Sequence, residues 1–543
     1  MAESSKLLVI LCLALFFLYF RLGSWGLMET SEARYAEIGK EMVETRDYIH
    51  PNLLGIHHYH KPPVTYYITT FGYKIFGISE IGARFFLPIA IIIQMLLVYL
   101  IGDMLLLDKK KALFAVLIYF SFPIVLISGR NLTTDAYLTT FIMTSIFFWL
   151  VYEAKNTQVW ALYLAFLFLG IAMETKPVAI LFVFPFMIYY HVFYNKKLKI
   201  NRHLIIGLAL FIMLTVSWFL IVQRDTEGLI SYYFNRQLLD RAIRKTFHRG
   251  QPIWYYLPFL IGVLLPWLPL IFKRNKSLPP KKENNGTKVI AFSATTIFLL
   301  FSLFQTKLPL YILPCFWMIA LLISSMISRA KPVILHYINF TFWFIILLLA
   351  SLTLYFYLKN GFPFIIPTSE ILITFSIVII LLIIQLKWKT DSSQKTAIFA
   401  FIFGCSILLV SSLLLEKNNS NINSIKDLAV YIESKDPSEK KEIMVYNHLL
   451  NSAPFYFHGR IITLNNGNYT ADREVQFEKD QFWKQNLLNL NQKEDKKRFI
   501  SIAKHQKSYL LVMKKDLKTV HPNYITKYYQ HEKAFGKWIV YSH

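Results

Sequence analysis

The chain has 543 residues, of which 55% are hydrophobic and 17% charged, and a mean hydropathy of +0.41 excludes a soluble protein of this size. The net charge of +25 does not indicate nucleic-acid binding, because the lysines form short clusters between apolar runs. The three cysteines, Cys12, Cys315 and Cys405, lie within apolar runs, which argues against a disulfide framework and against a thiolate metal cluster.

The apolar runs predict a polytopic α-helical membrane protein. Runs long enough to cross hydrocarbon about 30 Å thick as helices occur about thirteen times. The first of them resembles the apolar part of a signal peptide, but no small-residue cleavage site follows it, so we interpret it as a retained anchor. The predicted spans are 6–22, 81–106, 112–130, 133–152, 158–174, 177–194, 203–222, 253–272, 289–305, 308–328, 333–357, 367–386 and 395–415.

Clusters of basic residues give the predicted orientation. If the spans alternate, these clusters all fall on one face, which the positive-inside rule makes the cytoplasmic face. The N-terminus is then cytoplasmic, and the loops 23–80 and 223–252, together with everything after residue 415, are extracytoplasmic. The clusters lie at residues 109–111, 196–199, 273–288, 329–331 and 387–389.

The first external loop, 23–80, is the most polar segment near the membrane. Its residues 31–45 predict a short helix with one apolar face, lying along the membrane surface. Gly55 breaks the chain, and the prolines at 62 and 63 end whatever precedes a second amphipathic piece at 64–76. The loop therefore predicts two short helices separated by an irregular, histidine-rich turn.

The second external loop, 223–252, is strongly basic. It carries Arg236, Arg241, Arg244 and His248 on the face where the positive-inside rule expects few cations. An anionic ligand at the outer leaflet is the simplest reason for such charge.

The tail, 416–543, changes character and predicts a small α/β domain. Residues 424–427 have the pattern of a capping box at a helix start. Short apolar runs at 443–446, 460–464, 509–513 and 538–541 predict strands. The chain thus divides into a membrane part, 1–415, and an extracytoplasmic domain, 416–543.

Several ionisable residues are candidates for function, and each has a simpler interpretation. Glu32 and Arg34 also suit the solvated face of a surface helix. Lys61, before two prolines, also suits an interfacial anchor. Asp135 begins a predicted span, where a carboxylate caps the helix. Lys307 lies in a connection too short to be a solvated loop, so a ligand role is equally well supported.

Histidines at 57, 58 and 60 alternate in a way that would supply two metal ligands, although an exposed histidine-rich turn usually binds none. No P-loop, dinucleotide fingerprint or Ser-His-Asp pattern is present in the sequence. The sequence also lacks a pair of Gly/Pro-broken spans in matched halves, the pattern that would indicate a secondary transporter.

Taken together, the motifs resemble the aminoarabinose transferases, which belong with the protein O-mannosyltransferases to the polytopic glycosyltransferases of the C-type (GT-C) fold. The match covers about residues 20–315. Its pieces are Glu-x-Arg-Tyr-Ala-Glu at 32–37, Pro51 and Gly55, His-Lys-Pro-Pro at 60–63, Arg130 with Thr134-Asp135, Thr175-Lys176, Trp-Tyr-Tyr-Leu-Pro at 254–258, Leu-Pro-Trp at 265–267 and Lys-Leu-Pro-Leu-Tyr-Ile-Leu-Pro at 307–314.

The resemblance implies an enzyme that uses a polyprenyl-phosphate-linked sugar at the outer face of the membrane. The family's phosphate-binding lysine matches Lys61, its loop arginine Arg34, and the tyrosine of its Lys-Leu-Pro-x-Tyr motif Tyr311. To this donor phosphate-binding set we add three residues: Tyr59, Lys307 and Arg241.

Two positions depart from the family pattern. Ser31 stands where the family usually has Asp, so the catalytic carboxylate is one of Glu32, Asp135 and Glu29. His60 stands where the aminoarabinose transferases have a Glu associated with zinc, and His60 with His248 is the alternative zinc site. No other cofactor is expected.

The predicted function is transfer of a sugar from a polyprenyl-phosphate donor to a glycolipid of the lipid A type, or to another cell-surface acceptor. The predicted location is the bacterial inner membrane. Transfer to protein, as in protein O-mannosyltransferases, remains an alternative acceptor. A polytopic transporter or lipid flippase is the alternative of another class. No nucleic-acid partner is expected.

Overall fold

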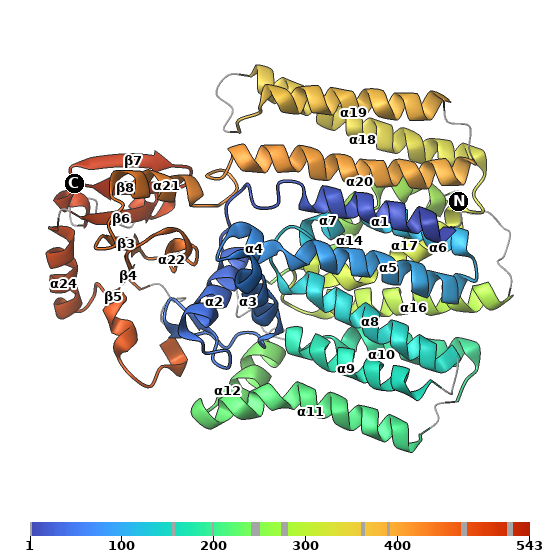
Figure 1. The fold of residues 1–543 in the computed structure, drawn as a ribbon, viewed down its shortest axis with the longest axis horizontal. Coiled ribbons are helices and arrows are strands. Elements are labelled where there is room, and N and C mark those ends of the chain that lie inside the picture. Colours follow the sequence, from blue (N-terminus) through green and yellow to red (C-terminus); the bar gives the residue numbers. More distant parts are fainter. Residues whose placement is uncertain are drawn as a thin grey trace.

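The structure is a computed structural model, and it describes residues 3–154, 158–197, 200–240, 250–272, 281–359, 364–387, 391–467, 475–505, 507–518 and 525–543. A bundle of long helices occupies one end of the molecule and a smaller α/β domain the other (Figure 1). The short helices α2 and α3 lie between them. Both the polytopic helical part and the C-terminal sheet domain were predicted, and both are confirmed.

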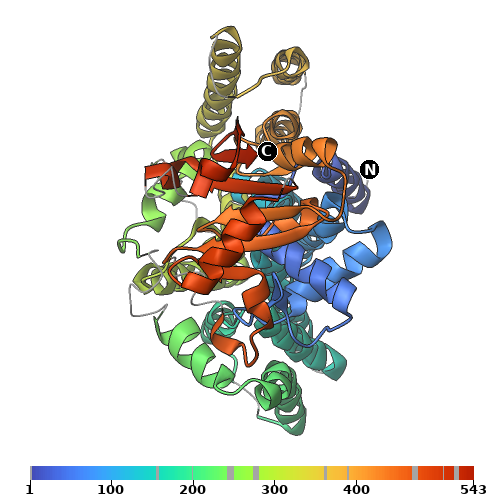
Figure 2. The same ribbon diagram turned by 90° about the vertical axis from the view of Figure 1, so that its left-hand side faces the viewer.

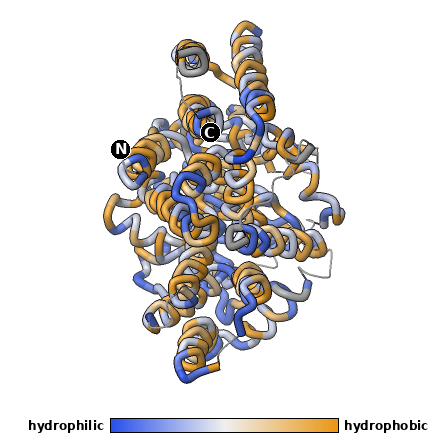
Figure 3. Tube along the Cα trace, turned by 90° about the vertical axis from the view of Figure 1, so that its right-hand side faces the viewer, coloured by the Kyte–Doolittle hydropathy of each residue, from blue (hydrophilic) through white to orange (hydrophobic). Residues whose placement is uncertain are grey.

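Helix occupies every predicted apolar run. Figure 3 shows the bundle end-on, with hydrophobic residues predominating along its helices. These helices are α1 (Glu3–Tyr19), α5 (Phe86–Leu106), α6 (Lys109–Phe120), α7 (Pro123–Ser128), α8 (Thr134–Ala154), α9 (Val159–Thr175), α10 (Ile180–Tyr194), α11 (Arg202–Asp225), α14 (Tyr256–Val263), α15 (Pro269–Phe272), α16 (Lys281–Leu303), α17 (Phe316–Ile327), α18 (Pro332–Leu358), α19 (Thr368–Lys387) and α20 (Ser392–Lys417).

Among the described residues, seven helical segments are long and apolar enough to cross a membrane, and three apolar helices are shorter. Two predicted spans are broken by proline, which cannot donate a helical hydrogen bond. Pro123 separates α6 from α7, and Pro266 lies in the short 3₁₀ turn η2 (Leu265–Trp267) between α14 and α15. Apolar runs in the sequence therefore do not all correspond to single straight helices.

One end of the bundle carries basic side chains of the first predicted cluster. Lys6 of α1, Lys110 of α6 and Gln394 of α20 line one cavity of about 670 Å³, and Lys110 pairs with Asp391 at 2.8 Å. The first basic cluster therefore lies at the end of the bundle that carries the N-terminus, while the α/β domain lies at the other end (Figure 1).

The loop 23–80 contains the two predicted helices, with a short hairpin where an irregular turn was predicted. It contains α2 (Ser31–Thr45) and α3 (Val64–Phe76), with α4 (Glu80–Arg84) leading into α5. Between α2 and α3 a hairpin of β1 (Asn52–Leu53) and β2 (Ile56–His57) turns through Leu54 and Gly55. Both turn residues have positive φ, +59° and +70°, as a two-residue hairpin turn of the favoured hand requires.

The C-terminal domain has a six-stranded sheet of order β5-β4-β3-β6-β8-β7. The first four strands are parallel, and β8 and β7 add in antiparallel fashion. The four predicted strands are confirmed; β5 and β7 were not predicted. The elements are α21 (Lys426–Lys435), β3 (Glu442–Tyr446), α22 (Ala453–Tyr456), β4 (Arg460–Asn465), β5 (Leu487–Asn489), α24 (Lys493–Ala503), β6 (Ser508–Met513), β7 (His531–Phe535) and β8 (Trp538–Ser542).

The capping box predicted at 424–427 is wrong in detail. The helix begins one residue later than predicted, with Ile425 at the N-cap position and no hydrogen bond from a capping side chain. Ser424 Oγ accepts from the Lys426 amide at 3.3 Å, while Asp427 accepts from Asn419 and Ser420 instead of capping the helix. The carboxylate serves the junction between the two parts of the chain.

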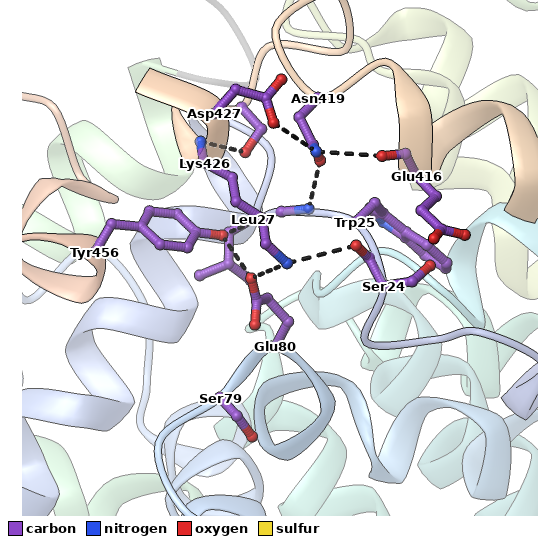
Figure 4. A network of polar contacts seen from close by, with 12 residues as sticks. Ser24, Trp25, Leu27, Ser79, Glu80, Glu416, Asn419, Lys426, Asp427 and Tyr456 are labelled. Atoms are coloured by element: carbon purple, nitrogen blue, oxygen red, sulfur yellow. Dashed lines mark hydrogen bonds and ion pairs between the residues drawn. The ribbon is translucent and has the colours of Figure 1, made fainter. Parts of the chain in front are cut away.

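That junction is a polar network (Figure 4). The Gly26 amide donates to Asn419 at 2.8 Å and the Leu27 amide donates to Tyr456 at 2.7 Å. Glu80 pairs with Lys426 at 2.9 Å and also accepts from the Tyr456 hydroxyl. Figure 2, viewed from the C-terminal side, shows the sheet in front of the bundle with α2 and α3 beside it. The α/β domain is thus bound directly to the first external loop.

Candidate active site

A cavity of about 390 Å³ opens where the turn before α3, the α9–α10 connection, η1 (Tyr233–Leu239) and η3 (Pro309–Cys315) meet. Its polar lining is His60, Lys61, Lys176, Gln237, Thr306 and Tyr311. Its apolar lining is Met173, Pro177, Val178, Ile180, Leu181, Tyr233, Phe301 and Phe304. The cavity, called the transfer cavity below, combines two cations with a wall that suits a hydrocarbon chain.

The turn before α3 places His60 and Lys61 in this lining. Pro62 and Pro63 stop the preceding segment, so the chain enters α3 at Val64. The His60 ring stacks on Tyr232, with 5.9 Å between centroids and 23° between planes. Lys61 follows this histidine in the chain and is half-buried. It lines the transfer cavity, so a residue predicted to bind phosphate lies at the cavity wall.

A second cation stands in the same lining. Lys176, at the end of α9, donates to Asp135 at 2.8 Å, and its ammonium lies 3.9 Å from the centre of the Tyr311 ring. Both members of the ion pair are buried. Asp135 therefore positions Lys176 at the cavity wall, while the ring of Tyr311 lies beside the charge.

Glu32 has a different environment from the one predicted. Its carboxylate is 1% exposed and receives both Nε and Nη2 of Arg84 at 2.8 Å. It also accepts from the backbone amides of Met28 and Leu132. Glu32 is therefore no solvated surface residue, and its contacts favour a role in holding α2 against α4 rather than contact with substrate.

Glu29 and Arg34 both lie outside the cavity lining. Glu29 accepts from the amide and hydroxyl of Ser452 and from Asn451, and burial raises the pKa of its carboxyl while the charge of Arg34 opposes that rise. Arg34 Nε is buried and makes no hydrogen bond with the described residues. Glu29 thus joins the first external loop to the C-terminal domain.

Two further residues of the predicted phosphate set do not line the cavity. Tyr59 is fully buried in an aromatic cluster with Trp218 and Phe477, and burial raises the pKa of its phenol to about 12. Lys307 is buried and donates to the backbone carbonyls of Gln251 and Phe304. Those contacts hold the connection before η3, next to Thr306 of the lining.

The remaining predicted residues, Arg241 and His248, lie outside the described residues. Within the described part of the chain, no three His, Cys, Asp or Glu side chains are grouped as a metal site would need. His60 is placed on the cavity wall, so it remains the one described member of the predicted zinc pair.

Two important residues were not chosen from the sequence. Lys176 belongs to the Thr175-Lys176 piece of the family resemblance but was not included in the predicted phosphate-binding set, although an ammonium in so apolar a setting is costly unless it binds something. Arg84, which is fully buried, has the same signal, because it begins a run of hydrophobic residues. The sequence does not show which carboxylate each cation meets.

The Tyr311 contact gives a first prediction. We expect Tyr311→Leu to weaken donor binding about fivefold, because a cation–π contact contributes about 1 kcal/mol. Tyr311→Phe keeps the ring, so binding should fall only if the hydroxyl itself contacts the donor phosphate. Measuring Kd for a polyprenyl phosphate with both variants separates the role of the ring from that of the hydroxyl. If both variants bind as tightly as the wild type, Tyr311 has neither role in donor binding.

A model of the family described as dolichyl-phosphate-mannose-protein mannosyltransferase matches residues 60–221. Over 330 residues the chain is 28% identical to an undecaprenyl phosphate-alpha-4-amino-4-deoxy-L-arabinose arabinosyl transferase of Pseudomonas fluorescens, covering 59% of this chain and 58% of the relative. A transferase of the same name from Edwardsiella ictaluri is 30% identical over 326 residues, covering 58% of each chain.

The fold extends further than the sequence match. The crystal structure of ArnT from Cupriavidus metallidurans bound to undecaprenyl phosphate superposes with a TM-score of 0.76 at 19% identity, covering 99% of this chain and 98% of that one. Its apo form gives a TM-score of 0.77. By sequence, the match spans about 58% of the length of these curated relatives.

The fold and the cavity define a polytopic membrane protein with the architecture of the GT-C glycosyltransferases. Within that class, the resemblance to the aminoarabinose transferases predicted from the motifs is confirmed by the curated relatives and by the mannosyltransferase family model.

Proposed function

We propose that the protein is a glycosyltransferase that moves a sugar from a polyprenyl-phosphate donor to a glycolipid or another cell-surface acceptor. The observation that carries the proposal is the transfer cavity, in which Lys61 and Lys176 stand beside an apolar wall. A polyprenyl-phosphate sugar has the same two parts, an anionic phosphate and a long hydrocarbon chain. The similar ArnT was crystallised with undecaprenyl phosphate, which has this chemistry.

The charges suit the proposed reaction. As the bond between sugar and phosphate breaks, positive character develops on the sugar and negative charge grows on the leaving phosphate. Fixed ammonium groups at the wall stabilise that growing charge without reorganising. The apolar wall holds the chain, at about 25 cal/mol per Å² of surface removed from water. Asp135 supports Lys176 here, and it becomes a base for an acceptor hydroxyl only if the pair opens.

Transfer is tested with purified protein in vesicles that contain a polyprenyl-phosphate aminosugar and a lipid A acceptor. The enzyme releases polyprenyl phosphate and adds the sugar to the acceptor, both measured by mass spectrometry. A flippase would move the donor and leave the bond to phosphate intact. Replacing lipid A by a peptide acceptor distinguishes the alternative, protein O-mannosyltransferase-like function.

The proposal includes a topology. We place about thirteen membrane crossings with the N-terminus in the cytoplasm and the α/β domain on the outer face of the bacterial inner membrane. The basic cluster at 109–111 supports this orientation. A cysteine introduced at exposed Glu439 should then react with an impermeant maleimide in intact spheroplasts, and one at Lys109 only after lysis.

A block in the apolar wall gives a further prediction. Leu181→Trp adds volume to the lining of the transfer cavity, so KM for a long-chain donor should rise about tenfold or more while a short-chain donor is used normally. Ile188→Trp on the exposed side of the same helix, where the side chain is 58% exposed, is the matched control. Equal effects on both donors would place the hydrocarbon chain elsewhere.

The zinc requirement remains a prediction of its own. If a zinc ion bound by His60 and His248 is needed, exhaustive chelation abolishes transfer and added Zn²⁺ restores it. His60→Ala should then be insensitive to added metal. Transfer that continues unchanged after chelation would contradict this site without affecting the role of Lys61.

A further inference from the structure

A third cavity, of about 320 Å³, lies between α2 and the C-terminal domain. One wall is formed by α2, with Glu37, Glu41 and Glu44 at helical spacing. The other wall includes Trp483 and Asn486 of the C-terminal domain. This cavity, called the interdomain cleft below, shares no lining residue with the transfer cavity.

Glu37 is the unusual member of this wall. Its side chain is 1% exposed, and its Oε2 makes no hydrogen bond with any described residue. The other oxygen lies 3.5 Å from the Lys40 ammonium. Burial raises the pKa of Glu37 to about 8. A buried carboxyl oxygen without a partner is costly, so a ligand that forms a hydrogen bond with it would complete this wall.

Three carboxyl groups of α2 line the cleft beside one lysine of the same helix. Lys40 is shared, because it also lies 3.4 Å from Glu44. Glu41 accepts from the backbone amide of Gly55 at 3.3 Å, and burial raises the pKa of its carboxyl to about 7. Arg460, at the opposite wall, donates to Asn486 and the Gln485 carbonyl and pairs with Glu442. The three carboxyl groups of α2 thus share one lysine of their own helix, and because the pKa of Glu37 lies above neutral pH, that group keeps its proton unless a cation takes its place.

The opposite wall suits the carbon skeleton of such a ligand. Trp483 is half-buried and its indole Nε1 donates to the Asp480 carbonyl at 3.0 Å, which fixes the ring as part of the lining. An aromatic face next to carboxylates favours an ammonium group or the carbons beside it. Asn486 and Thr463 add polar groups that suit hydroxyls.

We propose that the interdomain cleft binds a small primary amine of the size of an amino sugar. Glu37 and Glu41 accept from its ammonium group, and Trp483 packs on its carbon skeleton. The site is separate from the proposed sugar transfer and stands whether or not that proposal does. Its occupancy would be transmitted to the hairpin before Lys61, because Glu41 holds that hairpin through the Gly55 amide.

Equilibrium dialysis of the full-length protein in detergent at pH 7 tests the proposal with radiolabelled glucosamine and glucose, which differ by the ammonium group. We expect saturable binding of one glucosamine per chain, at least about tenfold tighter than that of glucose. Glu37→Gln and Trp483→Phe should each weaken glucosamine binding about tenfold or more, a loss of about 1.4 kcal/mol. Glu439→Gln, which changes an exposed carboxylate of the C-terminal domain outside the cleft lining, is the matched control.

Three results would overturn the proposal. The first is equal binding of glucose and glucosamine. The second is wild-type binding by both Glu37→Gln and Trp483→Phe; the second variant decides if the first fails to fold. The third is displacement of glucosamine by Mg²⁺ at a lower concentration than by methylammonium, which would make the cleft an inorganic cation site. Lys61→Ala should leave glucosamine binding intact, and its loss there would assign the binding to the transfer cavity.

Discussion

Lys61→Ala is expected to lower kcat/KM for sugar transfer by about 100- to 1,000-fold, with the protein folded and correctly inserted. The reason is that Lys61 lines the transfer cavity, where in the proposed reaction its ammonium would stabilise charge on the leaving phosphate; losing one such group costs about 3–4 kcal/mol in the transition state. The measurement is the initial rate of polyprenyl phosphate release from vesicles at several donor concentrations.

Two other variants make this result specific. Lys61→Arg keeps the charge but changes its shape and reach, so it should recover part of the rate. Lys74→Ala removes a lysine from α3 that lies over the Tyr48 ring instead of the cavity, and it should transfer normally. Wild-type turnover by Lys61→Ala would refute the assigned role, and an equal loss in Lys74→Ala would indicate a general effect of charge at this surface.

Arg84→Met should destabilise the protein by about 3–5 kcal/mol, because it leaves the Glu32 carboxylate buried without its cation. Arg84 is completely buried and also donates to the backbone carbonyls of Leu22, Trp25 and Gly26. The measurement is the shift in thermal unfolding of the protein in detergent, followed by intrinsic fluorescence. Transfer activity should fall only in proportion to the fraction of protein that is unfolded.

The matched comparison is a pair at the other end of the bundle. Lys110→Met removes the partner of Asp391, but both side chains of that pair are 50% exposed, so the change should cost about 1 kcal/mol or less. If Glu32 is instead a substrate-contacting group, Glu32→Gln would abolish transfer without lowering the unfolding temperature. A large loss of stability in Glu32→Gln supports the positioning role.

The sequence predicted the elements whose patterns are local. The helices at 31–45 and 64–76 and four strands of the C-terminal sheet were recognisable because apolar residues follow the helical or strand period. It missed β7, His531–Phe535, whose residues are mostly exposed and polar because the strand is at an edge. It also missed β5, which has only three residues.

The site was harder to predict because its contacts join distant segments. Lys61 and Tyr311 were identified from motif resemblance, and both line the transfer cavity. The family resemblance makes Glu32 a catalytic candidate because Ser31 replaces the usual Asp, and no local pattern reveals that the partner of Glu32 is Arg84, which is 52 residues away. The sequence marks costly charges at a membrane, but only the fold shows which of them neutralise one another.

The anchorage of the first external loop has a consequence for how the protein is made. Glu29 binds Ser452, and Gly26 and Leu27 bind Asn419 and Tyr456, so partners about 400 positions apart hold the loop in place. During synthesis the N-terminal loop leaves the ribosome long before these partners exist. We infer that the loop bearing Lys61 gains its final shape only once the C-terminal domain has been translated and folded. Completion of the chain is then itself the step that makes the protein competent.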